Sequence, residues 1–147
     1  MLIDEGLELL TEDQCRSLLA TGGVGRVGVT IGGLPAILPV NFAYVDNDIV
    51  FRTGEGTKLH AASRGSIIAF EIDDYDADER SGWSVLLVGH SSTVTDYDAR
   101  VALDRRGLAT WAGSERSSYV RLHPELITGR RIMTDVTFGP ARARDSG

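Results

Sequence analysis

The fold is decided by residues 24–58, which read VGRVGVTIGGLPAILPVNFAYVDNDIVFRTGEGTK. Apolar residues alternate with Gly and Thr from Val27 to Ile31, which is the period of a half-buried strand. Gly32-Gly33 is a two-residue hairpin signal, so a return strand is expected from Pro35 to about Val45. A second turn and a third strand over 49–53 follow. This stretch therefore predicts an antiparallel meander of three strands.

The flanking segments continue the pattern. Thr11 and Gln14 have the spacing of a capping box, which predicts a helix that begins after Thr11 and ends at Thr21-Gly22-Gly23. Pro39 inside the second strand predicts a bulge or an unpaired edge position. The remaining expected elements are a short helix at 58–63, strands at 66–72, 83–88 and 93–95, a helix at 98–111, and strands at 118–122 and 129–133.

Short strands joined by tight turns, with few helices, predict a mainly β fold that closes into an antiparallel barrel with flanking helices. A chain of 147 residues without an internal repeat or a linker predicts one domain over residues 1–147. We expect its core at about residues 8–133. The Gly-, Pro-, Arg- and Ser-rich residues 139–147 predict a flexible tail.

Composition narrows the function classes. The formal net charge is −6, from 15 basic and 21 acidic residues, which disfavours nucleic acid as a partner. No apolar run is long enough to span a membrane, and the first residues lack the basic region of a signal peptide. The lone Cys15 excludes an internal disulfide and favours a core role. We therefore expect a cytoplasmic protein without a membrane partner.

The sharpest local signal for a binding site is residues 52–58, RTGEGTK. Two glycines permit a tight turn, and the N–H groups at the start of the following helix favour an anion. Arg52 offers a bidentate fork and Lys58 a point charge, while Thr53 and Thr57 offer hydroxyl donors. This set suits a phosphate monoester. The alternative is a glycine-rich turn with solvated charges.

Two other segments and the histidines are candidates for a binding or metal site. The stretch GWSV at 82–85 opens a strand, where a Trp packs in a core or interface or forms the wall of a site for a flat aromatic ligand. Six acidic residues and no basic ones occupy residues 71–79, and a loop is expected over 73–79. Glu79 and Val85 stand where a calcium loop needs Gly and Glu. The three histidines share no metal-ligand spacing: His60, His90 and His123. No metal site is predicted.

Six motifs together carry a family likeness: VGRV (24–27), LPVNF (38–42), VFRTGEGTKL (50–59), AFEID (69–73), GWSV (82–85) and ITGR (127–130). Over about residues 8–133 the chain resembles the pyridoxamine 5′-phosphate oxidase-like proteins of the flavin and deazaflavin oxidoreductase superfamily. The resemblance implies a split antiparallel β-barrel of the FMN-binding type. It also implies a homodimer that binds FMN in a groove between the subunits.

The resemblance also implies which residues contact the cofactor. The phosphate would be held by Arg52, Thr53, Thr57 and Lys58. The isoalloxazine ring would be lined by Pro39, Val40 and Asn41. Two further contacts would come from the fifth strand, of the same chain or of the partner chain: Trp83 and Ser84. The sequence identifies no catalytic side chain.

The function implied is an FMN-binding oxidoreductase-like protein that acts on an unidentified small molecule. Three alternatives remain open. One is a deazaflavin-dependent reductase on the same fold, whose longer anionic coenzyme would need further cations such as Arg130 or Arg131. The second is a flavin-binding module without turnover, and the third is a family member without a cofactor. Haem is disfavoured because no histidine fits a haem-ligand motif.

Overall fold

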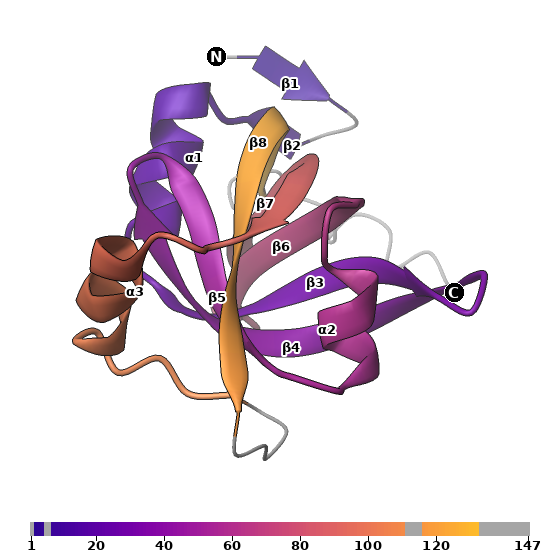
Figure 1. The fold of residues 1–147 in the computed structure, drawn as a ribbon. Helices are drawn as coiled ribbons and strands as arrows, with labels where there is room; N and C mark the ends of the chain where they lie inside the picture. Colours follow the sequence, from indigo (N-terminus) through magenta and orange to yellow (C-terminus); the bar gives the residue numbers. More distant parts are fainter. Residues whose placement is uncertain (1, 5–6, 111–115, 133–147) are drawn as a thin grey trace, which may run out of the picture.

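The structure, a computed structural model, describes residues 2–4, 7–110 and 116–132 (Figure 1). The predicted tail at 139–147 lies outside the described residues. Within them, no helix is long and apolar enough to cross a membrane. In chain order the elements are β1 (Leu2–Asp4), β2 (Leu7–Leu9), α1 (Glu12–Leu19), β3 (Gly23–Ile31), β4 (Leu34–Val45), β5 (Asp48–Gly54), α2 (Lys58–Ala62), β6 (Ile67–Asp76), β7 (Ser81–Thr93), α3 (Tyr97–Asp104) and β8 (Ser117–Ile132).

Six of the strands close into a barrel. The pairing order is β8, β5, β4, β3, β6 and β7, and β7 pairs back to β8. Every strand pair is antiparallel, and the short β1 and β2 extend the sheet from the far end of β8. In Figure 1, α1 and α3 lie on one side of the barrel and α2 lies on the other. The prediction of a mainly β, antiparallel barrel is confirmed.

The barrel interior is the hydrophobic core. The rings of Phe42 and Phe70 meet edge to face, with centroids 4.8 Å apart. Cys15 and Leu19 on α1 are fully buried against this core, and burial raises the pKa of the Cys15 thiol. The predicted capping box is present, because the Gln14 N–H donates to Thr11 Oγ1 over 3.1 Å and the Thr11 N–H donates to Gln14 Oε1 over 2.8 Å.

β4 and β5 pair with each other along only part of their length. β4 pairs with β3 from Leu34 to Phe42, but it pairs with β5 only from the Phe42–Phe51 pair to the Val45–Asp48 pair. Pro39 therefore has β3 on one side and no strand partner on the other among the described residues, as an unpaired edge position predicts. The opening between the two strands is the split in the barrel.

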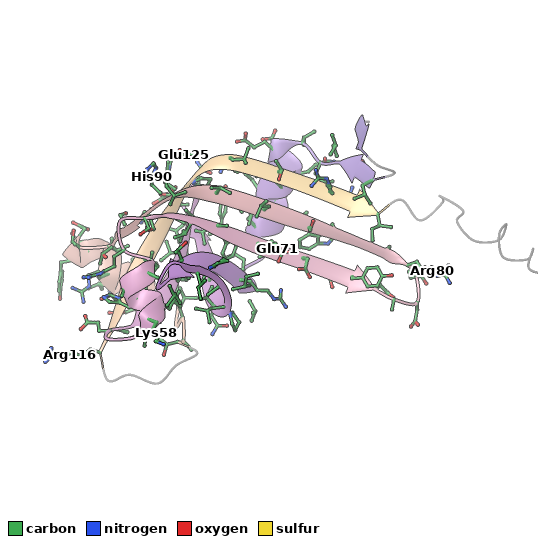
Figure 2. All side chains as sticks on the ribbon, turned by 90° about the vertical axis from the view of Figure 1, so that its right-hand side faces the viewer. Lys58, Glu71, Arg80, His90, Arg116 and Glu125 are labelled. Atoms are coloured by element: carbon green, nitrogen blue, oxygen red, sulfur yellow. The ribbon has the colours of Figure 1, made fainter. Side chains whose placement is uncertain are left out.

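The acidic segment is mostly strand rather than loop. Residues 73–76 continue β6 and pair with residues 81–84 of β7, so the turn is only residues 77–80. In Figure 2, Arg80 lies at the tip of this long hairpin. The sequence prediction of an acidic loop from residue 73 was wrong because pairing with β7 overrides the low strand propensity of Asp.

Two further boundaries differ from the sequence prediction. The helix predicted at 98–111 ends at Asp104, and Gly107, with φ of +71°, follows it. The separate strands predicted at 118–122 and 129–133 are one strand, β8, and those predicted at 83–88 and 93–95 are one strand, β7. The β7–β8 register shifts between Val88 and Gly89, so the ladder continues through an irregularity rather than ending there.

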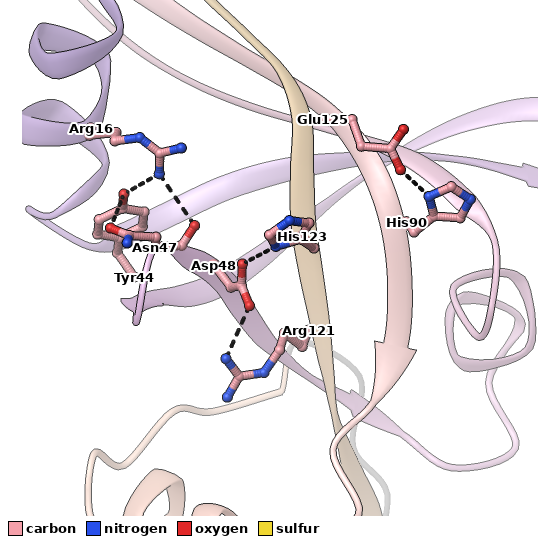
Figure 3. A network of polar contacts seen from close by, with 8 residues as sticks. All are labelled: Arg16, Tyr44, Asn47, Asp48, His90, Arg121, His123 and Glu125. Carbon is pink, nitrogen blue, oxygen red and sulfur yellow. Dashed lines mark hydrogen bonds and ion pairs between the residues drawn. The ribbon is translucent and has the colours of Figure 1, made fainter.

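A buried carboxylate ties the start of β5 to β8 (Figure 3). Asp48 is only 9% exposed. Its Oδ2 accepts from Arg121 Nη1 over 3.1 Å, and its Oδ1 contacts His123 Nδ1 over 2.8 Å. On the neighbouring bulge, His90 contacts Glu125. The Asp48 contacts therefore join the start of β5 to β8 beside the first backbone pair of the two strands, Ile49 with Leu122.

We expect Asp48→Ala to lower the free energy of unfolding by about 1–3 kcal/mol, since it leaves the half-buried Arg121 without its carboxylate. Urea denaturation at pH 7 measures the change. The control is Asp78→Ala, an exposed position in the β6–β7 turn without positive φ, whose carboxylate makes no hydrogen bond or ion pair with the described residues. Equal stability of the two variants would contradict a structural role for the Asp48 contacts.

Candidate functional site

A pocket of about 330 Å³ lies at the split between β4 and β5. Its apolar wall comes from Ile31, Leu38, Val40 and Leu59, and Thr110 approaches from the segment after α3. The pocket brings together six of the nine residues predicted to contact a cofactor: Pro39, Val40, Arg52, Thr53, Thr57 and Lys58. The sequence motif and the topology therefore converge on one place.

Local backbone structure places the charged end of this pocket. β5 ends at Gly54, and Gly56, with φ of +86°, turns the chain into α2. Thr57 caps α2: its Oγ1 accepts from the His60 N–H over 3.1 Å and donates to the Gly54 carbonyl over 2.7 Å. The Thr57 hydroxyl hydrogen is thus used within the loop.

Thr53 also contributes to the loop rather than to its open surface. It is 1% exposed, and its Oγ1 lies 2.9 Å from His60 Nδ1 and 3.4 Å from the Ser118 carbonyl oxygen. The two threonines, expected as hydroxyl donors to a phosphate, both hold the turn in shape here. The two hydroxyl hydrogens are therefore engaged within the loop, and its cationic side chains are the groups left to face an anion.

Arg52 is half-buried and held from several directions. Its Nε donates to Ser117 Oγ over 2.7 Å, its Nη1 donates to the Leu108 carbonyl over 2.9 Å, and Cζ lies 5.5 Å from the centroid of the Tyr119 ring. Tyr119 is itself buried and donates to Asp104 Oδ1 over 2.6 Å. Burial, and then this hydrogen bond, raise the pKa of Tyr119 to about 12.

Lys58 contrasts with Arg52. It is exposed at the start of α2 (Figure 2) and lines the same pocket. Within the described part of the chain, its ammonium has no hydrogen bond or ion pair. Asn41, predicted to line a flavin ring, instead donates from Nδ2 to the Ala109 carbonyl over 3.2 Å. Asn41 does not line the pocket.

Trp83 and Ser84 lie elsewhere, in a second pocket of about 390 Å³ at the far end of β6 and β7. Trp83 packs against the core, and the pocket also contains Glu71, Asp73 and Arg130. The nine predicted residues therefore do not form one site within a single chain. Among the residues described, no group of three His, Cys, Asp or Glu side chains could hold a metal ion.

Glu71 is the most perturbed carboxyl group of this second pocket. Burial first, and then the neighbouring Asp73, raise its pKa to about 7, while Arg26, 3.8 Å away, opposes the shift. A carboxyl group in the unfolded chain has a pKa near 4.5. The folded protein therefore binds more protons than the unfolded chain between these pH values, so this group favours folding increasingly as the pH falls from about 7 to 4.5.

We expect Glu71→Gln to raise the melting temperature at pH 8, where the native carboxylate is charged and partly buried, and to change it little at pH 5. Thermal unfolding at both pH values measures this. Glu79→Gln, at the exposed turn of the same hairpin, is the control and should show no such pH dependence. A Glu71→Gln effect of equal size at pH 5 and pH 8 would contradict the assignment.

Sequence reasoning missed the residues that hold Arg52 and Asn41 in place from outside the pocket. Leu108 and Ala109 supply carbonyl acceptors, and Ser117 and Tyr119 contact the Arg52 guanidinium. These residues lie more than 50 positions from Arg52 in the chain. The sequence did predict a strand that contains Tyr119. It did not predict that this strand pairs with β5, and that pairing is what brings Tyr119 to Arg52.

Comparison with known proteins agrees with this geometry. A family model described as pyridoxamine 5′-phosphate oxidase matches residues 11–131. The chain belongs to this family. The resemblance inferred from the six motifs is thereby confirmed, and the closed ring with a split between β4 and β5 is the split β-barrel that the resemblance implied.

Similar proteins and solved structures cover most of the chain. An uncharacterized protein of Mycobacterium tuberculosis is 38% identical over 131 residues, which is 86% of each chain. The FAD binding protein from Mycobacterium smegmatis has a TM-score of 0.73 and 35% identity, covering 86% of this chain and all of its own. A FAD-binding protein from Mesorhizobium loti, at 20% identity and a TM-score of 0.67, shares the fold, covering 85% of this chain and 96% of its own.

Proposed function

We propose that the protein is a flavin-nucleotide-binding oxidoreductase of the pyridoxamine 5′-phosphate oxidase family that acts on a small molecule. The observation that carries the proposal is the pocket at the β4–β5 split. There, two cations, Arg52 and Lys58, stand at one end of an apolar wall. A flavin nucleotide also has a charged part and an apolar part: a phosphate at the end of a sugar chain, and a flat aromatic ring. The phosphate matches the two cations, and the ring matches the apolar wall.

The residues present fit such a cofactor. Arg52 and Lys58 would hold the phosphate by charge-assisted contacts. Pro39, Val40 and Leu59 would face the apolar parts of the ligand. The volume of about 330 Å³ is at the low end of the usual range for small-molecule pockets, roughly 300–1,000 Å³, so another surface is needed to cover the rest of a flavin.

FMN is the cofactor predicted from the sequence, and FAD is the second candidate. The observation that favours FAD is the relative from Mycobacterium smegmatis, which is described as FAD binding and is 35% identical. Both nucleotides carry a phosphate next to the ribityl chain, which is the group assigned to Arg52 and Lys58. The phosphate assignment therefore applies to either flavin.

A bound flavin would supply the hydride or electron transfer, and the chain would bind and orient it. No Asp, Glu or His lines the pocket among the described residues. We therefore assign no acid or base, and a flavin-binding module without turnover is the alternative from another functional class. A deazaflavin-dependent reductase is the alternative within the fold. Arg130, a candidate partner for its longer anionic chain, lies in the second pocket.

The proposal includes a homodimer, supported by an exposed apolar face. Five register partners share this face across β4, β3, β6, β7 and β8: Ile37, Gly28, Ala69, Val88 and Leu126. Ile37 is 74% exposed and Leu126 is 51% exposed. A second copy on this face would bury them and could bring the partner's Trp83 pocket to the flavin.

Sedimentation of the protein at micromolar concentration tests the homodimer. The expected mass is twice 15.9 kDa, and a monomer would refute a site shared between two subunits.

Titration of the protein with four ligands tests the function. Flavin fluorescence reports binding of FMN, FAD and riboflavin, and fluorescence of the deazaflavin coenzyme reports the alternative. Saturable binding of FMN or FAD at least tenfold tighter than riboflavin is the expected result. Preference for the deazaflavin coenzyme would move the function to the alternative reductase. Binding of none of the four would overturn the proposal.

A further inference from the structure

The Arg52 guanidinium occupies a pre-formed cradle. It leaves β5 opposite Tyr119, its register partner on β8. Ser117 and Tyr119 are two residues apart on β8, so both side chains face the same side of the strand. The Ser117 hydroxyl accepts from Nε over 2.7 Å, and the Tyr119 ring lies 5.5 Å from Cζ. The Leu108 carbonyl accepts from Nη1 over 2.9 Å.

These contacts leave the Nη2 amino group of Arg52, with both of its N–H donors, for a ligand. The Nη2 amino group makes no hydrogen bond to the described residues, and Arg52 lines the pocket at the β4–β5 split. An unrestrained Arg side chain has many rotamers, and ordering it on binding lowers affinity. A guanidinium that is already fixed avoids most of that loss.

We propose that Ser117 is a positioning residue for the phosphate of the flavin nucleotide: its hydroxyl fixes the Arg52 guanidinium so that Nη2 faces the pocket. The inference rests on the proposed function. Ser117 itself does not line the pocket, so it acts through Arg52 alone. Its effect should therefore fall on ligands with a phosphate and not on the flavin ring.

The test compares the dissociation constants of FMN and riboflavin, which differ only in the phosphate, for four proteins. Ser117→Ala removes the hydroxyl, and Ser117→Thr retains one at the same place. Ser118→Ala is the matched control, because Ser118 points its hydroxyl at Glu55 and not at Arg52. Flavin fluorescence gives both constants for the wild type and each variant, and thermal unfolding checks that each is folded.

Ser117→Ala should reduce the preference for FMN over riboflavin by about three- to tenfold, as expected for one lost hydrogen bond, with riboflavin affinity unchanged. Ser117→Thr should restore most of the preference, and Ser118→Ala should leave it intact. If the wild type prefers FMN and Ser117→Ala keeps that preference, the positioning role is refuted while the proposed function stands. If the wild type itself does not distinguish the two flavins, the phosphate assignment fails first and the positioning role with it.

Discussion

Arg52→Ala should weaken FMN binding by about 10- to 100-fold, the equivalent of a lost charge-assisted contact of about 1.5–3 kcal/mol. Riboflavin binding should change far less, because the lost cation is assigned to the phosphate. Lys58→Ala should act in the same direction with a smaller effect, since the Lys58 ammonium is exposed and screened by water and salt. Titration by flavin fluorescence measures all four constants.

The control for these variants is Arg64→Ala. Arg64 is an exposed cation just after α2 and does not line the pocket. The Arg64→Ala substitution removes one positive charge from the same region. It therefore shows how much of any loss of affinity comes from the change in net charge alone. Unchanged FMN affinity in both Arg52→Ala and Lys58→Ala would sink the phosphate assignment. An equal loss in Arg64→Ala would reduce it to a general electrostatic effect.

Gly89→Ala should destabilise the protein by about 3 kcal/mol, at the upper end of the usual effect of overpacking. Gly89 is buried on β7 beside the register shift with β8, opposite Pro124. An added Cβ would lie 1.9 Å from the His123 carbonyl oxygen. That atom belongs to the backbone, so only movement of β8 could make room. Urea denaturation at pH 7 measures the loss.

Gly28→Ala provides the comparison for Gly89→Ala. Because Gly28 lies on the proposed dimer face, the variants are compared at one protein concentration, and sedimentation checks that each keeps the wild-type oligomeric state. Gly28 also lies within a strand, but its added Cβ would be 3.4 Å from the Ala69 Cβ, which is an ordinary contact. We expect its stability to stay within about 0.5 kcal/mol of the wild type. Similar stability for the two variants would mean that the β7–β8 irregularity does not require glycine, and that this part of the barrel can adjust.

Local chemistry was enough to predict the first three long strands. Gly32 and Gly33 both adopt positive φ, and so do Asp46 and Asn47 in the next turn. Each turn therefore carries residues suited to its backbone, and strand boundaries follow. The short helix after Gly56 was predicted for the same reason. The loop of residues 52–58 was identified because its cations and glycines are neighbours in sequence.

Longer-range pairing decided what the sequence could not predict. β8 is continuous because β5 and β2 pair with successive parts of one edge while β7 pairs along the other. No local pattern in residues 123–128 predicts that strand. Likewise, Trp83 and Ser84 line a different pocket from the one that contains Arg52. The contact between Arg52 and the Leu108 carbonyl depends on how distant segments pack together. Local sequence propensities carry no information about that packing.

A crystal structure of the protein with its bound flavin nucleotide tests the phosphate assignment most directly. We expect the phosphate next to the ribityl chain to lie within hydrogen-bond distance of Arg52 and Lys58, at the split between β4 and β5. The ring should extend along the apolar wall near Pro39 and Val40. A flavin whose phosphate lies away from both cations would contradict the assignment, even if the flavin bound tightly.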